Sequence, residues 1–196
     1  MAEVVLFHHV QGLTEGVRAF AGRLRAGGHT VHTPDLYEGQ QFGTIDEGFA
    51  YMQGVGDEEF AVRTERALAG LPENPVYAGF SWGESIAQKL AQTRPGARGA
   101  LLLEGCLPIS GEWAVGPWPD GVPVQVHGMD ADPFFAREGD LDAAREIVAT
   151  VGPGLAELFT YPGDRHLFTD SSLPSYDPPA AELVLERALA FLGRVG

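Results

Sequence analysis

The sequence predicts an α/β fold with a mostly parallel sheet of about six strands and helices on both faces. The first observation behind this prediction is that short apolar runs alternate with stretches of helical periodicity along all 196 residues. The second is that the expected strands are almost continuously apolar, as strands are when helices cover both faces of a sheet. The length suits one domain spanning residues 1–196, and no repeat or linker divides it.

The first part of the chain is expected to form a strand, a helix, a second strand and a looser segment. These elements are expected at residues 4–8, 14–26, 29–33 and 35–56. Apolar residues at helical spacing give the helix one apolar face. Gly27 and Gly28 end that helix, and Pro34 closes the second strand. Five glycines in the looser segment indicate a loop with a short helix.

The remaining elements continue the alternation. Strands are expected at residues 76–80, 99–104, 122–127 and 155–161, and helices at residues 58–69, 83–93, 141–151 and 180–192. Asp57 is the expected N-cap of the first of these helices. Residues 105–121 are rich in Gly, Pro and Trp and are expected to form a long loop. In parallel sheets function gathers at the carboxyl ends of the strands, so we expect the site at that edge.

Residues 79–83, Gly-Phe-Ser-Trp-Gly, are the most informative motif in the chain. They follow an apolar strand and precede a helix, which is the context of a nucleophile elbow. Gly79 and Gly83 leave room for a tight turn, because a side chain at either position would collide with the neighbouring strand or helix. The turn places Ser81 at a helix N-terminus, where N–H groups and the helix dipole favour the oxyanion of acyl transfer. We therefore expect Ser81 to be a nucleophile rather than a serine in an ordinary glycine-rich turn.

A serine nucleophile needs a general base, and the base needs an orienting acid. In hydrolases with this elbow the chain order is serine, acid, histidine. His166 follows the last expected strand, where the base is needed, whereas His127 ends the fifth strand, too early to follow an acid on that strand's loop. The acid should follow the fifth strand, which leaves Asp130 or Asp132.

The oxyanion hole requires two N–H donors. One should be the residue after the nucleophile, Trp82, and the other should come from the loop after the first strand, where we nominate Val10. The adjacent His8 and His9 do not indicate a metal site, because neighbouring residues at a strand end point to opposite faces and no metal-binding histidine spacing is present.

Composition excludes several classes of function. The net charge of −14 repels phosphate backbones, so we expect no nucleic acid partner. No apolar run approaches the roughly 20 residues of a membrane span, and residues 1–7 lack the cationic start of a secretory signal, so we expect no membrane association. The single Cys106 cannot form an internal disulfide and suits a reducing compartment, which favours the cytoplasm.

These segments together resemble the dienelactone hydrolase family of α/β hydrolases, over nearly the whole chain. Residues 33–39 resemble that family's segment after its second core strand, and residues 79–83 match its elbow. Residues 132–134 resemble the stretch that bears the family's acid, and residues 163–168 the stretch that bears its histidine. The resemblance therefore favours Asp132 as the acid. It implies a compact α/β-hydrolase fold and a serine-nucleophile variant of the family's hydrolytic activity.

The chain also departs from the dienelactone hydrolases proper. They use cysteine at the position of Ser81, and a glutamate in the first conserved loop, where this chain has His9 or a neighbour. They bind the substrate carboxylate with arginines, one of them shortly after the catalytic histidine, where this chain has Asp170. Another lies between the second and third strands, yet residues 26–62 contain no Arg or Lys. These departures argue against dienelactone as the substrate.

The assembled residues predict a serine esterase that acts on a small, neutral or apolar carboxylic ester through an acyl-serine intermediate. Its partner is the small-molecule substrate, no metal or organic cofactor is needed, and a homodimer is compatible with the sequence. An acyl pocket and ordinary core packing account equally well for the aromatic residues Trp82, Phe134, Phe135, Trp113 and Trp118. Two alternatives stay open: a thioesterase or amidase with the same triad, and a non-catalytic binding protein on a hydrolase fold. Residues 39–56 and 105–121 are candidate lids.

Overall fold

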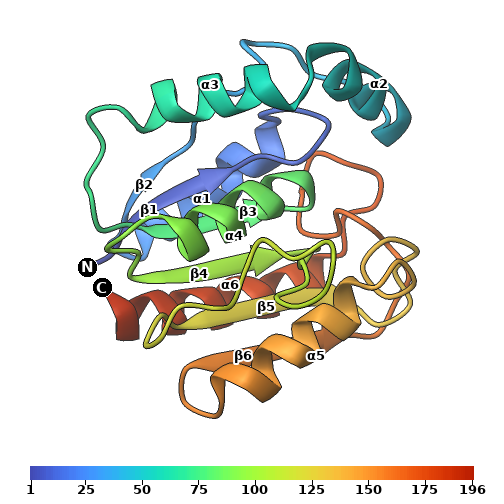
Figure 1. Cartoon of the computed structure of the whole chain (residues 1–196). Coiled ribbons are helices and arrows are strands. Elements are labelled where there is room, and N and C mark those ends of the chain that lie inside the picture. The colour runs from blue at the N-terminus through green and yellow to red at the C-terminus, as the bar shows by residue number, and fades with distance from the viewer.

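A six-stranded, fully parallel sheet forms the centre of the computed structural model, which describes residues 1–196 (Figure 1). The strands are β1 (Glu3–Phe7), β2 (Thr30–His32), β3 (Val76–Phe80), β4 (Gly99–Leu103), β5 (Val124–Met129) and β6 (Ala156–Tyr161). Their order across the sheet is β2-β1-β3-β4-β5-β6. The predicted fold class is confirmed.

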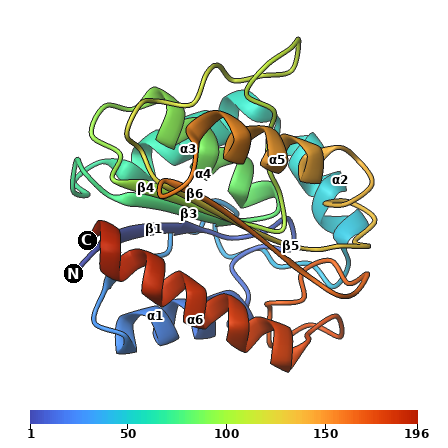
Figure 2. The ribbon, with the colours of Figure 1, turned by 90° about the horizontal axis from the view of Figure 1, so that it is seen from below.

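The chain has six helices, five of which cover the two faces of the sheet. The helices are α1 (Glu15–Ala26), α2 (Ile45–Val55), α3 (Asp57–Leu68), α4 (Trp82–Thr93), α5 (Asp140–Val151) and α6 (Pro178–Val195). Figure 2 shows α1 and α6 on one face and α3, α4 and α5 on the other. Each face has its own apolar core, because every central strand alternates side chains between the two layers. No helix combines the length and apolar character needed to cross a membrane.

Local capping interactions explain where several helices begin. The Thr14 side chain accepts the N–H of Val17 at the start of α1. Thr44 and Glu47 form a reciprocal capping box at the start of α2. The prediction that Asp57 caps the following helix is wrong. Gly56 is the N-cap of α3, with no side-chain bond, because α2 ends at this glycine and Asp57 is already the first helical residue.

The elbow brings α4 into backbone contact with the sheet. A Cβ atom added to Gly83 would lie 2.3 Å from the carbonyl oxygen of His8, at the carboxyl end of β1. A Cβ atom added to Gly79 would lie 2.1 Å from the carbonyl oxygen of Gly83. Real Cβ contacts are never so short, so only glycine fits at either position. The two glycines therefore let the N-terminus of α4 rest directly on β1 and β3, as the sequence predicts.

This close approach gives a test of the fold. We expect Gly83→Ala to lower the free energy of unfolding by about 1–3 kcal/mol, because the added methyl group meets backbone that cannot rotate away. Urea denaturation followed by circular dichroism measures the change. Gly193→Ala is the matched control: Gly193 is at an exposed position of α6, where an added Cβ meets nothing within 4 Å. It should stabilise the protein by about 0.5–1 kcal/mol. Equal stability of Gly83→Ala and wild type would contradict the close approach.

Candidate active site

Ser81 lies at the tip of the elbow in an unusual backbone conformation. Its φ and ψ are 48° and −118°, a region that residues other than glycine rarely adopt. Its N–H donates to the carbonyl oxygen of Leu103 at the end of β4, with an N···O distance of 2.7 Å. Although Ser81 is the N-cap of α4, its side chain makes no capping bond. The hydroxyl is therefore free to point away from the helix.

Ser81, His166 and Asp132 form one chain of hydrogen bonds. Ser81 Oγ lies 2.8 Å from His166 Nε2, and His166 Nδ1 lies 2.8 Å from Asp132 Oδ2. The other carboxylate oxygen, Asp132 Oδ1, accepts the N–H groups of Phe134 and Phe135. Asp132 is fully buried and His166 is 8% exposed, so the pair is shielded from water while Ser81 stays half-buried. The Asp132 carboxylate is thus held in a position from which it can accept a hydrogen bond from the His166 imidazole.

The structure brings Asp132 to the histidine and leaves the neighbouring Asp130 outside. Asp130 is exposed, and its carboxylate accepts the N–H of Gly163 across the turn. Asp164, close to the histidine in sequence, is exposed as well and makes no contact with it. Of the two aspartates that the residue pattern left open, only the one favoured by the family resemblance contacts His166.

The two nominated oxyanion donors flank the contact between α4 and β1. Trp82 is the first residue of α4, so its N–H has no acceptor within the helix. Val10 lies in the loop after β1, and its N–H makes no hydrogen bond in the protein. The carbonyl oxygen of Val10 packs against Gly48 of α2, where a Cβ would come within 2.2 Å. Both N–H groups are thus held by tight backbone packing and remain free to donate.

Comparison with known proteins identifies the family. The profile of the dienelactone hydrolase family matches residues 1–196. The chain belongs to the dienelactone hydrolase family. The resemblance predicted from the sequence is confirmed, and this family member is an α/β hydrolase. No curated protein sequence matches it significantly.

Solved structures similar to this dienelactone hydrolase family member share its fold at low sequence identity. A dienelactone hydrolase-like promiscuous phosphotriesterase from metagenomic libraries has a TM-score of 0.75 and 19% identity, and the match covers 100% of this chain and 87% of that one. A candidate dienelactone hydrolase from Klebsiella pneumoniae has a TM-score of 0.74 and 20% identity, covering 98% and 87%. A propionate-bound thermophilic esterase from Thermogutta terrifontis has a TM-score of 0.64 and 19% identity, covering 100% and 84%.

Two other buried histidines, His8 and His127, have hydrogen-bond partners, and burial favours their neutral forms. His8 Nδ1 donates to the carbonyl oxygen of His9, and its Nε2 accepts the N–H of Leu36. Burial lowers the pKa of His8 to about 4. His127 lies between the Tyr161 hydroxyl and Gln125 Oε1, and burial lowers its pKa to about 3. No three His, Cys, Asp or Glu side chains gather to hold a metal ion.

Some of the aromatic residues named from the sequence lie half-buried near the site, and others belong to the core. The ring centroid of Phe134 lies 4.6 Å from that of His166, and Trp82 packs against Tyr37 at 5.2 Å. Both Trp82 and Phe134 are half-buried, so each can contact a substrate beside Ser81. Three other aromatic residues, for which a pocket and the core were equally open, do not line the site: Phe135 and Trp118 belong to the core, and Trp113 is 82% exposed in the 105–121 loop. That loop contains no helix or strand.

Glu104 is a buried carboxyl group beside the site, and no sequence motif points to it. It follows β4, and its Oε1 accepts both the N–H and the hydroxyl of Thr169, on the segment that carries His166. Its Oε2 is buried without a hydrogen-bond partner. Burial raises the pKa of Glu104 to about 7, although His166 and Thr169 oppose the shift. Its position at the end of a strand indicated that Glu104 could lie near the site. Its burial could not be predicted, because it depends on residues 166–170 folding over the side chain.

The raised pKa of Glu104 makes stability depend on pH. The folded protein holds the proton up to about pH 7, whereas the unfolded chain releases it near its ordinary pKa of 4.5. Between these values the folded state binds more protons, so the stability contribution of Glu104 falls as pH rises and is constant above pH 7. Between pH 5 and pH 8 the free energy of unfolding of Glu104→Gln should therefore fall by about 1–3 kcal/mol less than that of wild type. Urea denaturation at each pH measures it.

Glu186→Gln, at an exposed position of α6, is the control and should leave the pH profile of stability unchanged. If the Glu104→Gln profile has the same slope as wild type across this range, Glu104 does not titrate as described.

Proposed function

We propose that this dienelactone hydrolase family member is a serine esterase that cleaves a small, neutral or apolar carboxylic ester through an acyl-serine intermediate. The observation that carries the proposal is the chain of two 2.8 Å contacts from Ser81 through His166 to Asp132. These three side chains come from the loops after β3, β5 and β6, which end at one edge of the sheet. That is the arrangement of a nucleophile, its base and the orienting acid.

In the proposed first step, Ser81 Oγ attacks the acyl carbon while His166 Nε2 accepts its proton. The imidazole becomes positively charged, and Asp132 Oδ2 stabilises that charge through the Nδ1–H bond. Because Asp132 Oδ1 already accepts two backbone N–H groups, the carboxylate is held in a fixed orientation. The N–H groups of Trp82 and Val10 receive the tetrahedral oxyanion at the N-terminus of α4.

The second half of the cycle reuses the same groups. His166 donates its proton to the departing alcohol oxygen, which leaves an ester between Ser81 and the acyl group. Water then attacks the acyl carbon, with His166 again as base, and a second tetrahedral oxyanion forms in the same place. The carboxylic acid leaves and Ser81 regains its proton. No step in this sequence calls on a cofactor.

The surroundings of the site favour a substrate without a carboxylate. The next basic residue along the chain after residues 26–62 is Arg63. Its guanidinium forms ion pairs with Glu38 and Glu59 and donates to the carbonyl oxygen of Leu36, so it is not free to bind a substrate carboxylate. Asp170 stands where the resemblance places a carboxylate-binding arginine, and it is buried. The half-buried rings of Phe134 and Trp82 offer apolar contacts beside Ser81. With the net charge of −14, these features support a neutral, apolar acyl group.

A thioesterase or an amidase would use the same groups, because the leaving atom contacts only His166 in this scheme. A non-catalytic binding protein is the alternative of a different class, and the hydrogen-bonded Ser81–His166 pair argues against it.

A buried free cysteine suits a reducing compartment, so we propose a cytoplasmic enzyme.

Hydrolysis of p-nitrophenyl acetate and butyrate tests the proposal. We expect wild type to turn over both esters, and Ser81→Ala and His166→Ala to lose about 10³-fold or more in kcat/KM, because each removes a group that acts in the transition state. Asp132→Asn should lose a similar factor, because the amide favours the wrong imidazole tautomer.

Asp130→Asn is the matched control, two residues from the acid but outside the hydrogen-bonded chain, and should stay within about twofold of wild type. A wild-type protein with neither turnover nor a burst of p-nitrophenol would refute the esterase proposal and bring the binding-protein alternative forward. Faster cleavage of the matching thioester or anilide would move the assignment to a thioesterase or an amidase.

A further inference from the structure

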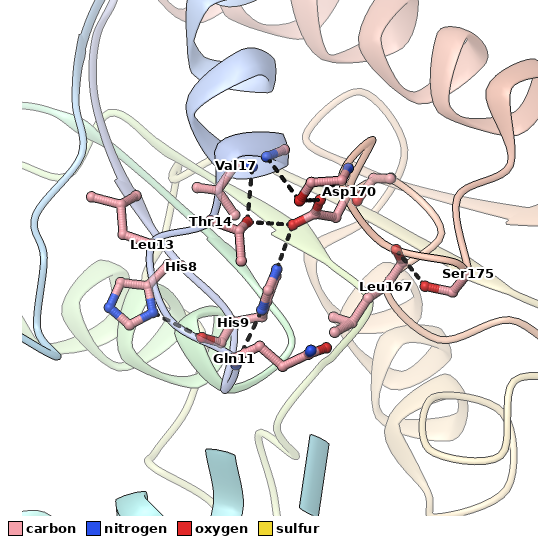
Figure 3. A network of polar contacts seen from close by, with 12 residues as sticks. His8, His9, Gln11, Leu13, Thr14, Val17, Leu167, Asp170 and Ser175 are labelled. Carbon is pink, nitrogen blue, oxygen red and sulfur yellow. Dashed lines mark hydrogen bonds and ion pairs between the residues drawn. The ribbon is translucent and has the colours of Figure 1, made fainter. Parts of the chain in front are cut away.

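Asp170 joins two loops at the edge of the proposed site. It lies four residues after His166, on the segment between β6 and α6, and is 2% exposed. Its Oδ2 accepts Nε2–H of His9 at 2.8 Å and the hydroxyl of Thr14, both from the loop after β1 (Figure 3). Its Oδ1 accepts the N–H and hydroxyl of Ser172 at 2.8 and 2.6 Å. One carboxylate thus ties the β1–α1 loop to the segment that carries the histidine.

The hydrogen bonds of His9 fix its tautomer. The N–H of Gln11 donates to His9 Nδ1 at 3.2 Å, so Nδ1 is unprotonated and the ring proton resides on Nε2, facing Asp170. Figure 3 shows the His9 ring directed at Asp170 and the His8 ring directed elsewhere. The imidazole therefore bridges the backbone at Gln11 and the carboxylate of Asp170. Between His9 and Gln11 lies Val10, the nominated oxyanion donor, with its N–H free.

The carboxylate of Asp170 is built to stay ionised. Burial alone would raise the pKa of Asp170, but the hydrogen bonds from His9, Ser172 and Thr14 outweigh it and lower the pKa to about 2. The carboxylate also presses against the first turn of α1, where a Cβ added to Gly16 would lie 1.7 Å from Asp170 Oδ1. Such an anion at a helix N-terminus is favourably placed. Each carboxylate oxygen of Asp170 already accepts two hydrogen bonds from protein groups, so the carboxylate is not available to bind a substrate.

We propose that His9 and Asp170 are positioning residues that hold the Val10 N–H in place as an oxyanion donor. Neither side chain touches the substrate; each acts through the backbone between His9 and Gln11. The inference rests on the proposed esterase function. Asp170 stands where the family resemblance places a substrate-binding arginine. In this chain that residue would support the oxyanion hole instead of binding the substrate.

Two substitutions of His9 separate its two contacts. In His9→Asn the side-chain oxygen can replace Nδ1 as acceptor for Gln11 N–H, but the side chain is too short to reach Asp170. In His9→Gln the terminal NH2 can replace Nε2–H as donor to Asp170, while the bond from Gln11 is lost. Ser172→Ala is the matched control, because it removes one hydroxyl donor to Asp170 and leaves the His9 contact intact.

We expect His9→Asn to lose about 30-fold in kcat on p-nitrophenyl butyrate with KM changed less than about threefold, because displacing one oxyanion donor weakens only the transition state. The inhibition constant of butaneboronic acid, which forms a tetrahedral adduct on Ser81, should rise by a similar factor. His9→Gln should recover most of the loss, and Ser172→Ala should stay within about twofold of wild type. Thermal melts confirm that each variant is folded.

Asp170→Asn supplies a second variant if His9→Asn does not fold. Ser172 N–H keeps the amide oxygen on its own side, so the NH2 group faces His9 Nε2–H and the tie is broken. The same losses in kcat and in boronate affinity are expected, with the acid limb of the pH–rate profile unchanged, because that limb reports His166.

Three results would overturn the inference. One is a folded His9→Asn variant with wild-type kcat and boronate affinity. Another is a loss that appears in KM alone. The third is a displaced acid limb, which would mean that the contact acts through His166 instead of Val10. Absence of ester turnover by wild type is a different failure, since it refutes the esterase function itself before any His9 variant is compared.

Discussion

The approach of the α4 N-terminus to the carboxyl end of β1 is the constraint on which the site depends. At Gly83 the helix backbone lies so close to the His8 carbonyl that no side chain fits between them. This contact fixes the distance between the elbow and the loop after β1, and therefore between the two N–H groups proposed to bind the oxyanion. The histidine and its acid then only need to reach Ser81 from the neighbouring loops. Backbone packing thus positions the elbow against β1, and side-chain hydrogen bonds position the histidine and the acid.

Around the site, buried carboxyl groups divide into two kinds. Asp170 is surrounded by donors, which hold its pKa at about 2. Buried Glu104 and half-buried Asp140 accept too few hydrogen bonds to offset their desolvation, which raises the pKa of Glu104 to about 7 and that of Asp140 to about 6. Burial also raises the pKa of Glu84, on the first turn of α4. The site is thus rich in carboxyl groups without the mutual repulsion that full ionisation of all of them would cause.

The sequence predicted the sheet, and it selected triad candidates whose side chains the structure brings together, because both follow from short-range patterns. Alternating periodicity located the elements, and the elbow motif with the serine–acid–histidine order pointed to Ser81 and His166. The order alone did not choose between Asp130 and Asp132, because either can end a turn; the family resemblance made that choice. The His9–Asp170 contact joins residues 161 positions apart, and no local pattern encodes such a pairing. Asp57 was misassigned as a cap because helix α2 runs up to Gly56 and leaves no connecting loop.

Four residues other than glycine have positive φ, and three of them surround the site: Ser81, Glu104 and Leu167. Each conformation costs of order 1–3 kcal/mol, and glycine would adopt it more easily. A chain selected for stability alone would accumulate glycine at these positions and lose its hydroxyl and its carboxyl there. Natural drift toward a more stable protein therefore runs against keeping the site, and thermostable variants should be sought among substitutions remote from this edge of the sheet.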